Sequence, residues 1–137
     1  MSREIRQVEG KAASGPALQI AADLSSQVSA AADETDRQRQ LTDDLVRSLK
    51  AAGVFRLLIP QTFGGLGAQL PDFIDALQRF AEADASTAWC VSQGAVIATT
   101  SLWLPADSVH ELWQDPATAI ANGPPRNCEA QRGKDSL

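Results

Sequence analysis

The sequence is poor in the residues that build metal sites and disulfide frameworks. Its 137 residues include a single histidine, His110, and two cysteines, Cys90 and Cys128. A zinc site needs several ligands at short spacing, and a disulfide framework needs a larger even set of cysteines. Neither pattern is present, so we predict no metal site and two reduced thiols. We interpret His110 as a solvated residue on the outer side of a short helix.

The chain also lacks an excess of basic residues. Its 17 acidic residues outnumber its 12 basic residues, which gives a net charge of −5. Proteins that bind nucleic acid or anionic lipid by charge carry the opposite excess, so we expect neither kind of partner. The first residues are polar and mixed in charge, and they lack the apolar centre of a signal peptide. A cytoplasmic location is the resulting expectation.

A long continuous apolar run is absent as well. No charged residue occurs between Asp84 and Asp107, but serine, threonine and glutamine residues interrupt this stretch. A membrane span needs about 20 predominantly apolar residues, so we predict a buried central helix instead. Ser86 is expected to cap this helix, which is predicted to run through Leu102 with both faces buried.

The spacing of the apolar residues predicts an all-α fold of about five helices. A first helix is expected from Pro16, and a second follows the cap residue Thr42 and ends at Gly53. Pro71 is predicted to open a third helix, and Pro105 opens a short fifth helix after the central one. The expected buried face of the third helix carries Phe73, Ile74, Leu77, Phe80 and Ala81.

Composition divides the chain into three parts. Residues 1–15 are polar and aperiodic and are predicted to form a flexible arm, residues 16–122 form the helical domain, and residues 123–137 form a tail. Within the domain, residues 54–70 are predicted to form a buried connection, and the stretch from Thr118 to Ala121 is a candidate strand. The glycines at 64, 65 and 67 lack the spacing of a nucleotide-binding loop, so we interpret them as a structural turn.

No catalytic constellation emerges from these residues. Cys90 lies between Trp89 and Val91, without a neighbouring base to activate it, and is interpreted as a packed thiol. Core packing is also the default for the tryptophans. The polar residues of the fourth helix are less easily explained, because buried polar groups need partners that a bound ligand can supply. These residues are Ser92, Gln93, Thr99 and Thr100.

Three motifs occur in a fixed order along the chain. They are Leu49-Lys50-Ala51-Ala52-Gly53-Val54-Phe55-Arg56, then Phe63-Gly64-Gly65, and then Asp84-Ala85-Ser86-Thr87-Ala88-Trp89. As a series, over about residues 18–125, they resemble the amino-terminal helical domain of the acyl-CoA dehydrogenase superfamily. The resemblance implies that domain's fold, truncated before the β middle domain that follows it in family members.

Further segments resemble the flavin-dependent monooxygenase branch of the superfamily. They are Ala88-Trp89, the stretch from Glu111 to Pro116, and Ile120-Ala121-Asn122-Gly123. The resemblance implies an amino-terminal fragment of a two-component hydroxylase that uses FAD or FMN. It also implies a flavin reductase partner, a homotetramer when complete, and a small-molecule substrate. Trp89, Gln93 and Val96 are the positions expected to line the substrate cavity.

The resemblance has two departures. Several phenol-hydroxylating members carry a histidine where this chain has Val96 and Ile97, which counts against a phenolic substrate. The middle domain and the carboxyl-terminal helical bundle, which hold most flavin contacts in the family, are also missing from these residues. We therefore assign no catalytic or flavin-binding residue and expect the fragment alone to be inactive and to retain no flavin. The alternatives are a fragment of a true acyl-CoA dehydrogenase and a non-enzymatic helical interaction module.

Overall fold

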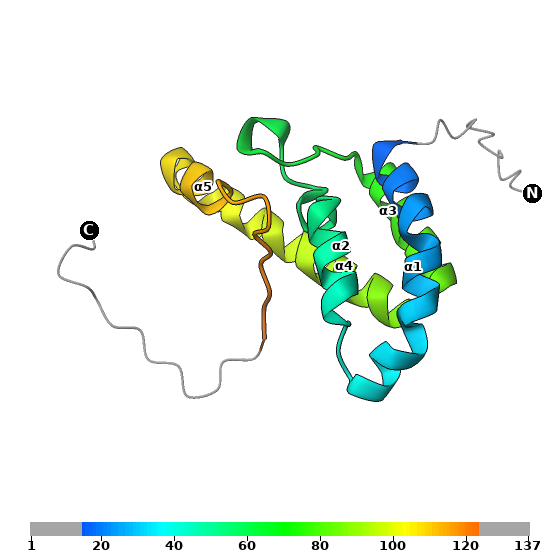
Figure 1. The fold of residues 1–137 in the computed structure, drawn as a ribbon. Helices are drawn as coiled ribbons and strands as arrows, with labels where there is room; N and C mark the ends of the chain where they lie inside the picture. The colour runs from blue at the N-terminus through cyan, green and yellow to red at the C-terminus, as the bar shows by residue number, and fades with distance from the viewer. Residues whose placement is uncertain (1–14, 124–137) are drawn as a thin grey trace, which may run out of the picture.

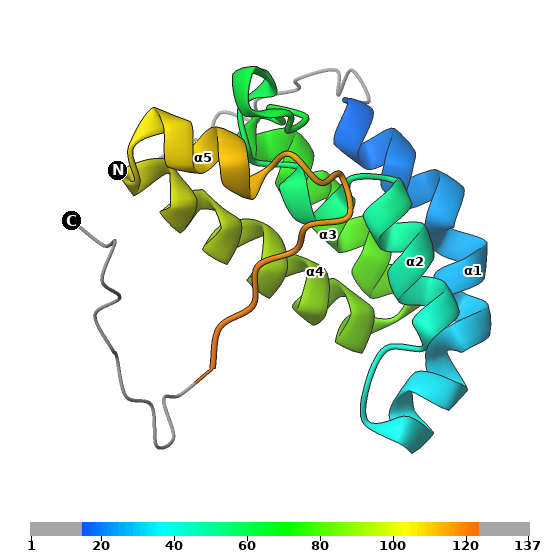
Figure 2. The ribbon, with the colours of Figure 1, turned by 60° about the vertical axis from the view of Figure 1, so that its left-hand side comes forward.

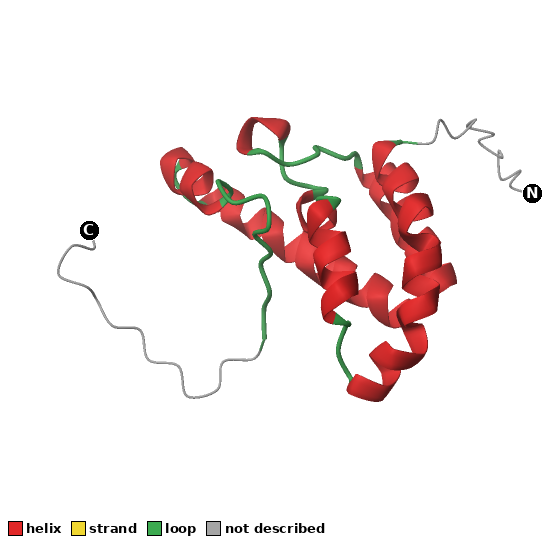
Figure 3. Cartoon of the chain, in the orientation of Figure 1, coloured by secondary structure: helices red, strands yellow, loops and turns green. Residues whose placement is uncertain are grey.

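The structure is a computed structural model that describes residues 15–123, and in this range it contains helices and loops without a strand (Figure 3). The α-helices are α1 (Pro16–Gln38), α2 (Asp43–Ala51), α3 (Leu70–Ala83), α4 (Ala85–Ala98) and α5 (Ala106–Leu112). Short 3₁₀ turns are η1 (Val54–Arg56), η2 (Gln61–Phe63) and η3 (Thr99–Trp103). The predicted all-α fold is confirmed, and the strand expected from Thr118 to Ala121 is wrong.

The predicted arm and tail fall largely beyond this range. Of the arm, residues 1–15, the structure describes Gly15 alone, and of the tail, residues 123–137, it describes Gly123 alone. Cys128 also lies outside the described residues. Within them, no helix combines the length and the apolar composition of a membrane span.

Helices α1 and α3 lie side by side with their amino-terminal ends adjacent (Figures 1 and 2). Gly15, the residue before α1, has no side chain to cap the helix, and Asp72 of α3 supplies the cap instead. Its Oδ2 accepts the N–H of Ala17 at 3.0 Å, and its Oδ1 accepts the N–H of Leu18 at 3.1 Å. These bonds satisfy two donors that every helix start leaves open. They also fix the relative position of α1 and α3.

The buried face of α3 differs in part from the expected one. Phe73 and Phe80 are buried as predicted, but Ile74 is 54% exposed and Ala81 is also exposed. Ala76 takes the inner position instead. A small residue at this position suits the close packing of α1 against α3, which share the largest contact between any two elements of the described chain.

The predicted boundaries of α2 are confirmed. The Thr42 hydroxyl accepts the N–H of Leu45 at 3.3 Å, as an N-cap does. After the last turn, Gly53 adopts the left-handed conformation with φ 71°, which glycine reaches without steric cost. The chain then turns directly into η1, whose residues are buried.

Asp84 joins α3 to α4 by itself. It follows the last residue of α3, and its carboxylate accepts the N–H of Thr87 at 2.7 Å in the first turn of α4. The expectation that Ser86 caps this helix is wrong, because Ser86 already lies inside the helix. The extended backbone of Asp84, φ −163° and ψ 120°, gives it the conformation that an N-cap requires.

The expectation that α4 is buried on both faces is wrong. Its inner side carries small residues such as Ala88, Ala95 and Ala98, all buried. Trp89 is 66% exposed and Val96 is 46% exposed on the other side. The α-helix also ends at Ala98 rather than Leu102, and continues as the tighter turn η3. The helix thus packs through Val91 and its small residues, and it leaves Trp89 and Val96 exposed.

Two hydrophobic clusters stabilise the described chain. The larger one joins the buried residues of α1 to α4 with those of η1. The smaller one joins the end of α4 to α5 and to the segment that follows α5; its buried members are Ile59, Ala98, Val109 and Trp113, and Ile120 packs against them. The second cluster therefore determines where the chain after α5 lies. Figure 2 shows this segment running back across α4.

Candidate functional site

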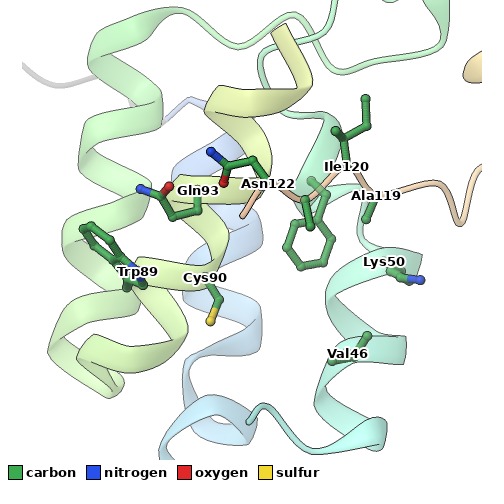
Figure 4. Close-up of a pocket in the computed structure, with 11 residues that line it drawn as sticks. Val46, Lys50, Trp89, Cys90, Gln93, Ala119, Ile120 and Asn122 are labelled. Atoms are coloured by element: carbon green, nitrogen blue, oxygen red, sulfur yellow. The ribbon is translucent and has the colours of Figure 1, made fainter. Parts of the chain in front are cut away.

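Helices α2 and α4 and the extended residues 119–122 surround a cavity of about 420 Å³ (Figure 4). It opens to the surface beside the exposed Trp89. Part of its floor is Phe55 of η1, against which α4 packs closely. The lining residues are Val46, Lys50, Phe55, Trp89, Cys90, Gln93, Gly94, Ala119, Ile120, Ala121 and Asn122.

The lining is mainly apolar, with few polar groups. Trp89 and Gln93 lie one turn apart on the same side of α4, and Asn122 comes from the opposite wall (Figure 4). The two carboxamides of Gln93 and Asn122 can both donate and accept hydrogen bonds. Lys50 brings the one charged side chain in the lining, and no carboxylate lines the cavity. Such a surface suits an apolar molecule that also carries a few polar atoms.

Close packing by Gly94 keeps the cavity in its present form. A Cβ atom at this position would lie 2.6 Å from Cδ1 of Phe55. Only the absence of a side chain therefore allows α4 to approach η1 so closely. The position of Phe55, and with it one side of the cavity, depends on this glycine.

Cys90 is partly buried between this cavity and a smaller polar one beside the end of α1. Burial raises the pKa of its thiol, and the nearby Asp84 carboxylate raises the pKa further. The thiol is therefore protonated at neutral pH and is a poor nucleophile. His110, the sole imidazole, contacts Phe63 with ring centroids 4.8 Å apart and ring planes inclined by 59°. The partial burial of Cys90 and the raised pKa of its thiol agree with the interpretation of this residue as a packed thiol.

The residues predicted to line a cavity are only partly brought together. Trp89 and Gln93 lie in the cavity wall, whereas Val96 lies further along α4 and outside the lining. Two of the four polar residues noted in this part of the sequence, Thr99 and Thr100, need no ligand as a hydrogen-bond partner. Thr99 and Thr100 of η3 donate to the carbonyls of Val96 and Ile97 in the last turn of α4 at 2.7 Å each, so their hydroxyls are satisfied locally.

Arg56 is the important residue that the sequence analysis did not single out. It is 8% exposed, and its guanidinium donates to the carbonyls of Gly64 at 2.9 Å, Trp113 at 3.2 Å and Asp115 at 2.8 Å. It also lies over the Trp113 ring, 5.1 Å from the centroid. A lone charge inside the apolar run from Val54 to Ile59 was the available signal. A charge in such a run needs buried acceptors.

The glycine loop is a structural turn, as predicted. Gly64 and Gly67 have φ values of 79° and 62°, in the left-handed region. A Cβ atom at Gly65 would lie 2.0 Å from the carbonyl oxygen of Ile59. The loop thus presents the Gly64 carbonyl to Arg56. In residues 15–123, no three side chains of the types that bind metals come together.

Comparison with known proteins gives a consistent result. Residues 19–106 match the family model described as "Acyl-CoA dehydrogenase, N-terminal domain". The chain is 35% identical over 124 residues to an indole-3-acetate monooxygenase of Pseudomonas putida, covering 88% of this chain and 31% of that protein. It is 35% identical over 66 residues to the oxygenase component of p-hydroxyphenylacetate 3-hydroxylase from Acinetobacter baumannii, covering 48% of this chain and 16% of that protein.

A solved structure is also similar. The HsaA monooxygenase from Mycobacterium tuberculosis superposes with a TM-score of 0.67 at 31% sequence identity, over 76% of this chain and 28% of that chain. The curated protein named as the oxygenase subunit HsaA of a flavin-dependent monooxygenase is 34% identical over 92 residues, covering 66% of this chain and 23% of that protein. The chain thus spans less than a third of the length of the relatives it matches.

Proposed function

Because the chain belongs to the acyl-CoA dehydrogenase family through its N-terminal domain, we propose that it serves as the amino-terminal helical domain of a flavin-dependent monooxygenase. The observation that carries the proposal is the match over 88% of this chain to a monooxygenase. The other relatives named above are oxygenases too, which favours this branch over a true acyl-CoA dehydrogenase. The proposed domain covers residues 16–122.

In this proposal the cavity between α2 and α4 is one wall of the substrate site. Trp89 and Gln93 contact the substrate, and Val96 lies at the approach to the site along the same helix. The apolar lining and its carboxamides support an aromatic substrate. Two relatives are named for aromatic acetates, and Lys50 is placed to attract the carboxylate of such a compound.

The described residues do not fit a complete flavin site. A flavin nucleotide carries phosphate, which proteins bind with clustered cations or with the amides of a glycine-rich turn before a helix. The cavity lining holds one cation, and the glycine loop is used for internal packing. We therefore propose that FAD or FMN is held largely by other parts of a longer polypeptide and supplies the electrons for oxygen activation there. The present chain contributes the substrate wall.

The partners follow from the same assignment. A reductase that supplies reduced flavin is the proposed partner, since two relatives are described as an oxygenase component or subunit. We also propose a homotetramer and a cytoplasmic location for the complete protein.

The test compares the polypeptide encoded by the whole reading frame with the isolated chain of 137 residues. The complete polypeptide, given reduced flavin and oxygen, is expected to convert an aromatic acid to a hydroxylated product. The isolated chain is expected to bind no flavin. Bleaching of bound flavin by acyl thioesters would instead identify a dehydrogenase. If neither polypeptide bound flavin, the result would favour the non-enzymatic interaction module.

A further inference from the structure

Residues 119–122 form the outer wall of the cavity, and backbone hydrogen bonds do little to hold this wall in place. In the described part of the chain, residues 119–122 make no hydrogen bond to any other segment. They follow a turn that reverses the chain after α5. Within this turn the Thr118 N–H donates to the Asp115 carbonyl at 3.0 Å, and the Thr118 hydroxyl donates to the Leu112 carbonyl at 3.2 Å. The position of the wall therefore depends on where this turn is anchored.

Arg56 anchors the turn to the body of the domain. Its Nη2 donates to the carbonyls of both Trp113 and Asp115, which lie 57 and 59 residues away in the sequence. Its Nη1 donates to Gly64 in the glycine loop. A guanidinium carries five donors on three nitrogens in a rigid plane and so reaches acceptors that lie apart, whereas the three donors of a lysine ammonium share one nitrogen. One buried side chain thus ties three separate segments together.

The anchor lies close to the wall. Asp115 precedes Ala119 by four residues, and Ile120 packs against the same cluster as Trp113. Arg56 is also next to Phe55 in η1, whose ring forms part of the cavity. Arg56 thus connects the segment that carries Phe55 with the turn that leads into residues 119–122, and it acts together with the second hydrophobic cluster.

We propose that Arg56 is a positioning residue that fixes the 119–122 wall through the carbonyls of Trp113 and Asp115, and thereby sets the width of the cavity. In a monooxygenase, the width of this cavity governs which substrate is accepted, and only this part of the proposal rests on the proposed function. The anchoring itself is a property of the chain as described. In this proposal Arg56 does not contact the substrate.

The test measures how often the wall leaves its place. Ile120→Cys introduces a thiol into the wall of a chain that also carries Cys90→Ala and Cys128→Ala. The rate of labelling by a maleimide is then measured with Arg56 intact, with Arg56→Met and with Arg56→Lys. We expect both substitutions to raise the labelling rate tenfold or more. The matched control is Arg79→Met, which removes an exposed arginine paired with Glu82, and should change the rate less than twofold.

Urea distinguishes anchoring from a general loss of stability. If the wall opens locally, the labelling rate of the Arg56 variants stays flat in urea concentrations below the unfolding transition. A rate that rises with the full denaturant dependence of global unfolding would overturn the proposal, as would an unchanged rate. Should Arg56→Met fail to fold, Arg56→Lys decides, and failure of both also contradicts a local role. Oxygenase activity does not enter this measurement, so it remains interpretable if the proposed function fails.

Discussion

The guanidinium of Arg56 lies over the indole of Trp113, whose own N–H donates to the Ser101 hydroxyl at 3.0 Å. Ser101 in turn donates to the Ala98 carbonyl at 2.7 Å. A buried chain of contacts therefore runs from η1 through Trp113, directly after α5, and Ser101 of η3 to the end of α4. Within it, the Ser101 hydroxyl satisfies the buried N–H of Trp113, which would otherwise have no partner.

Ser101→Ala removes the acceptor of the Trp113 N–H while leaving the ring in place. The indole N–H is then buried without a partner, which we expect to lower the free energy of unfolding by about 1–3 kcal/mol. Urea unfolding followed by circular dichroism measures this loss. Thr100→Ala is the control, because the Thr100 hydroxyl bonds only within its own helix and the residue is exposed. Equal losses in the two variants would show that the Trp113 contact contributes nothing.

Asp84→Ala should destabilise α4 and Ser86→Ala should not. The first substitution removes the carboxylate that accepts the Thr87 N–H, a loss of about 0.5–2 kcal/mol for an N-cap. The second changes an exposed residue inside the helix and should stay within about 0.5 kcal/mol of the parent. Both are measured by thermal and urea unfolding. The opposite ranking would place the cap at Ser86.

Asp72→Ala should loosen α1 from α3. Two amide donors of α1 lose their carboxylate acceptor, and we expect a loss of about 1–3 kcal/mol in unfolding free energy. Hydrogen exchange at Ala17 and Leu18 should accelerate in the variant while exchange in α4 changes less. Asp75→Ala provides the comparison, since Asp75 is exposed on the same helix. Uniform acceleration throughout the domain would argue against a local contact.

Gly94→Ala should destabilise the domain although alanine favours helices. The added methyl group would lie 2.6 Å from the Phe55 ring, and forcing it in costs about 1–3 kcal/mol, against a gain of about 1 kcal/mol in helix propensity. Gly123→Ala is neutral by comparison, because nothing lies within 4 Å of a Cβ there. Differential scanning calorimetry reports both. A more stable Gly94→Ala variant would mean that Phe55 moves freely.

Alkylation of Cys90 should require higher pH than alkylation of an exposed cysteine. Burial first, and then the charge of Asp84, raise the pKa of its thiol. The reactive thiolate is thus scarce near neutral pH and increases only above the ordinary cysteine range. Iodoacetamide rates across the alkaline range, in a Cys128→Ser background, give the midpoint. The raised pKa also makes stability depend on pH. The contribution of the thiol is fully present below its pKa in the unfolded chain, and it is lost as the pH rises through the higher pKa in the folded chain. A midpoint at or below that of a model thiol would contradict this environment.

Local chemistry explains which parts of the fold were predictable. Thr42 and Gly53 act on the backbone within a few residues, so the boundaries of α2 follow from the sequence. Pro71 lies in the first turn of α3, which begins one residue earlier than predicted, at Leu70. Asp84 and Ser86 are both good caps, and the choice between them depends on where α3 ends. The exposure of Trp89 depends on the small residues that allow the opposite side of α4 to pack. Composition alone does not reveal that arrangement.

The cavity was predictable only in the part that lies on one helix. The family resemblance implied Trp89, Gln93 and Val96 on the central helix, and Trp89 and Gln93 lie in the lining of the cavity. The opposite wall, residues 119–122, joins the site through contacts between distant segments, and Arg56 meets Trp113 across 57 residues. A single sequence contains no local pattern for such a pairing. Whether substrate contacts Trp89, Gln93 and Val96 stays a prediction.

The single-residue junction at Asp84 has a consequence for how the chain tolerates changes in length. An α-helix advances by about 100° per residue, so one residue inserted into the first turn of α4, just after this junction, would turn every later side chain of the helix by that angle about its axis. Trp89 and Gln93 would then point away from the cavity, and the small side chains that meet Phe55 would be replaced by larger ones. Substitutions at this junction change stability by small amounts. A change in the length of this first turn would alter which side of α4 faces the cavity.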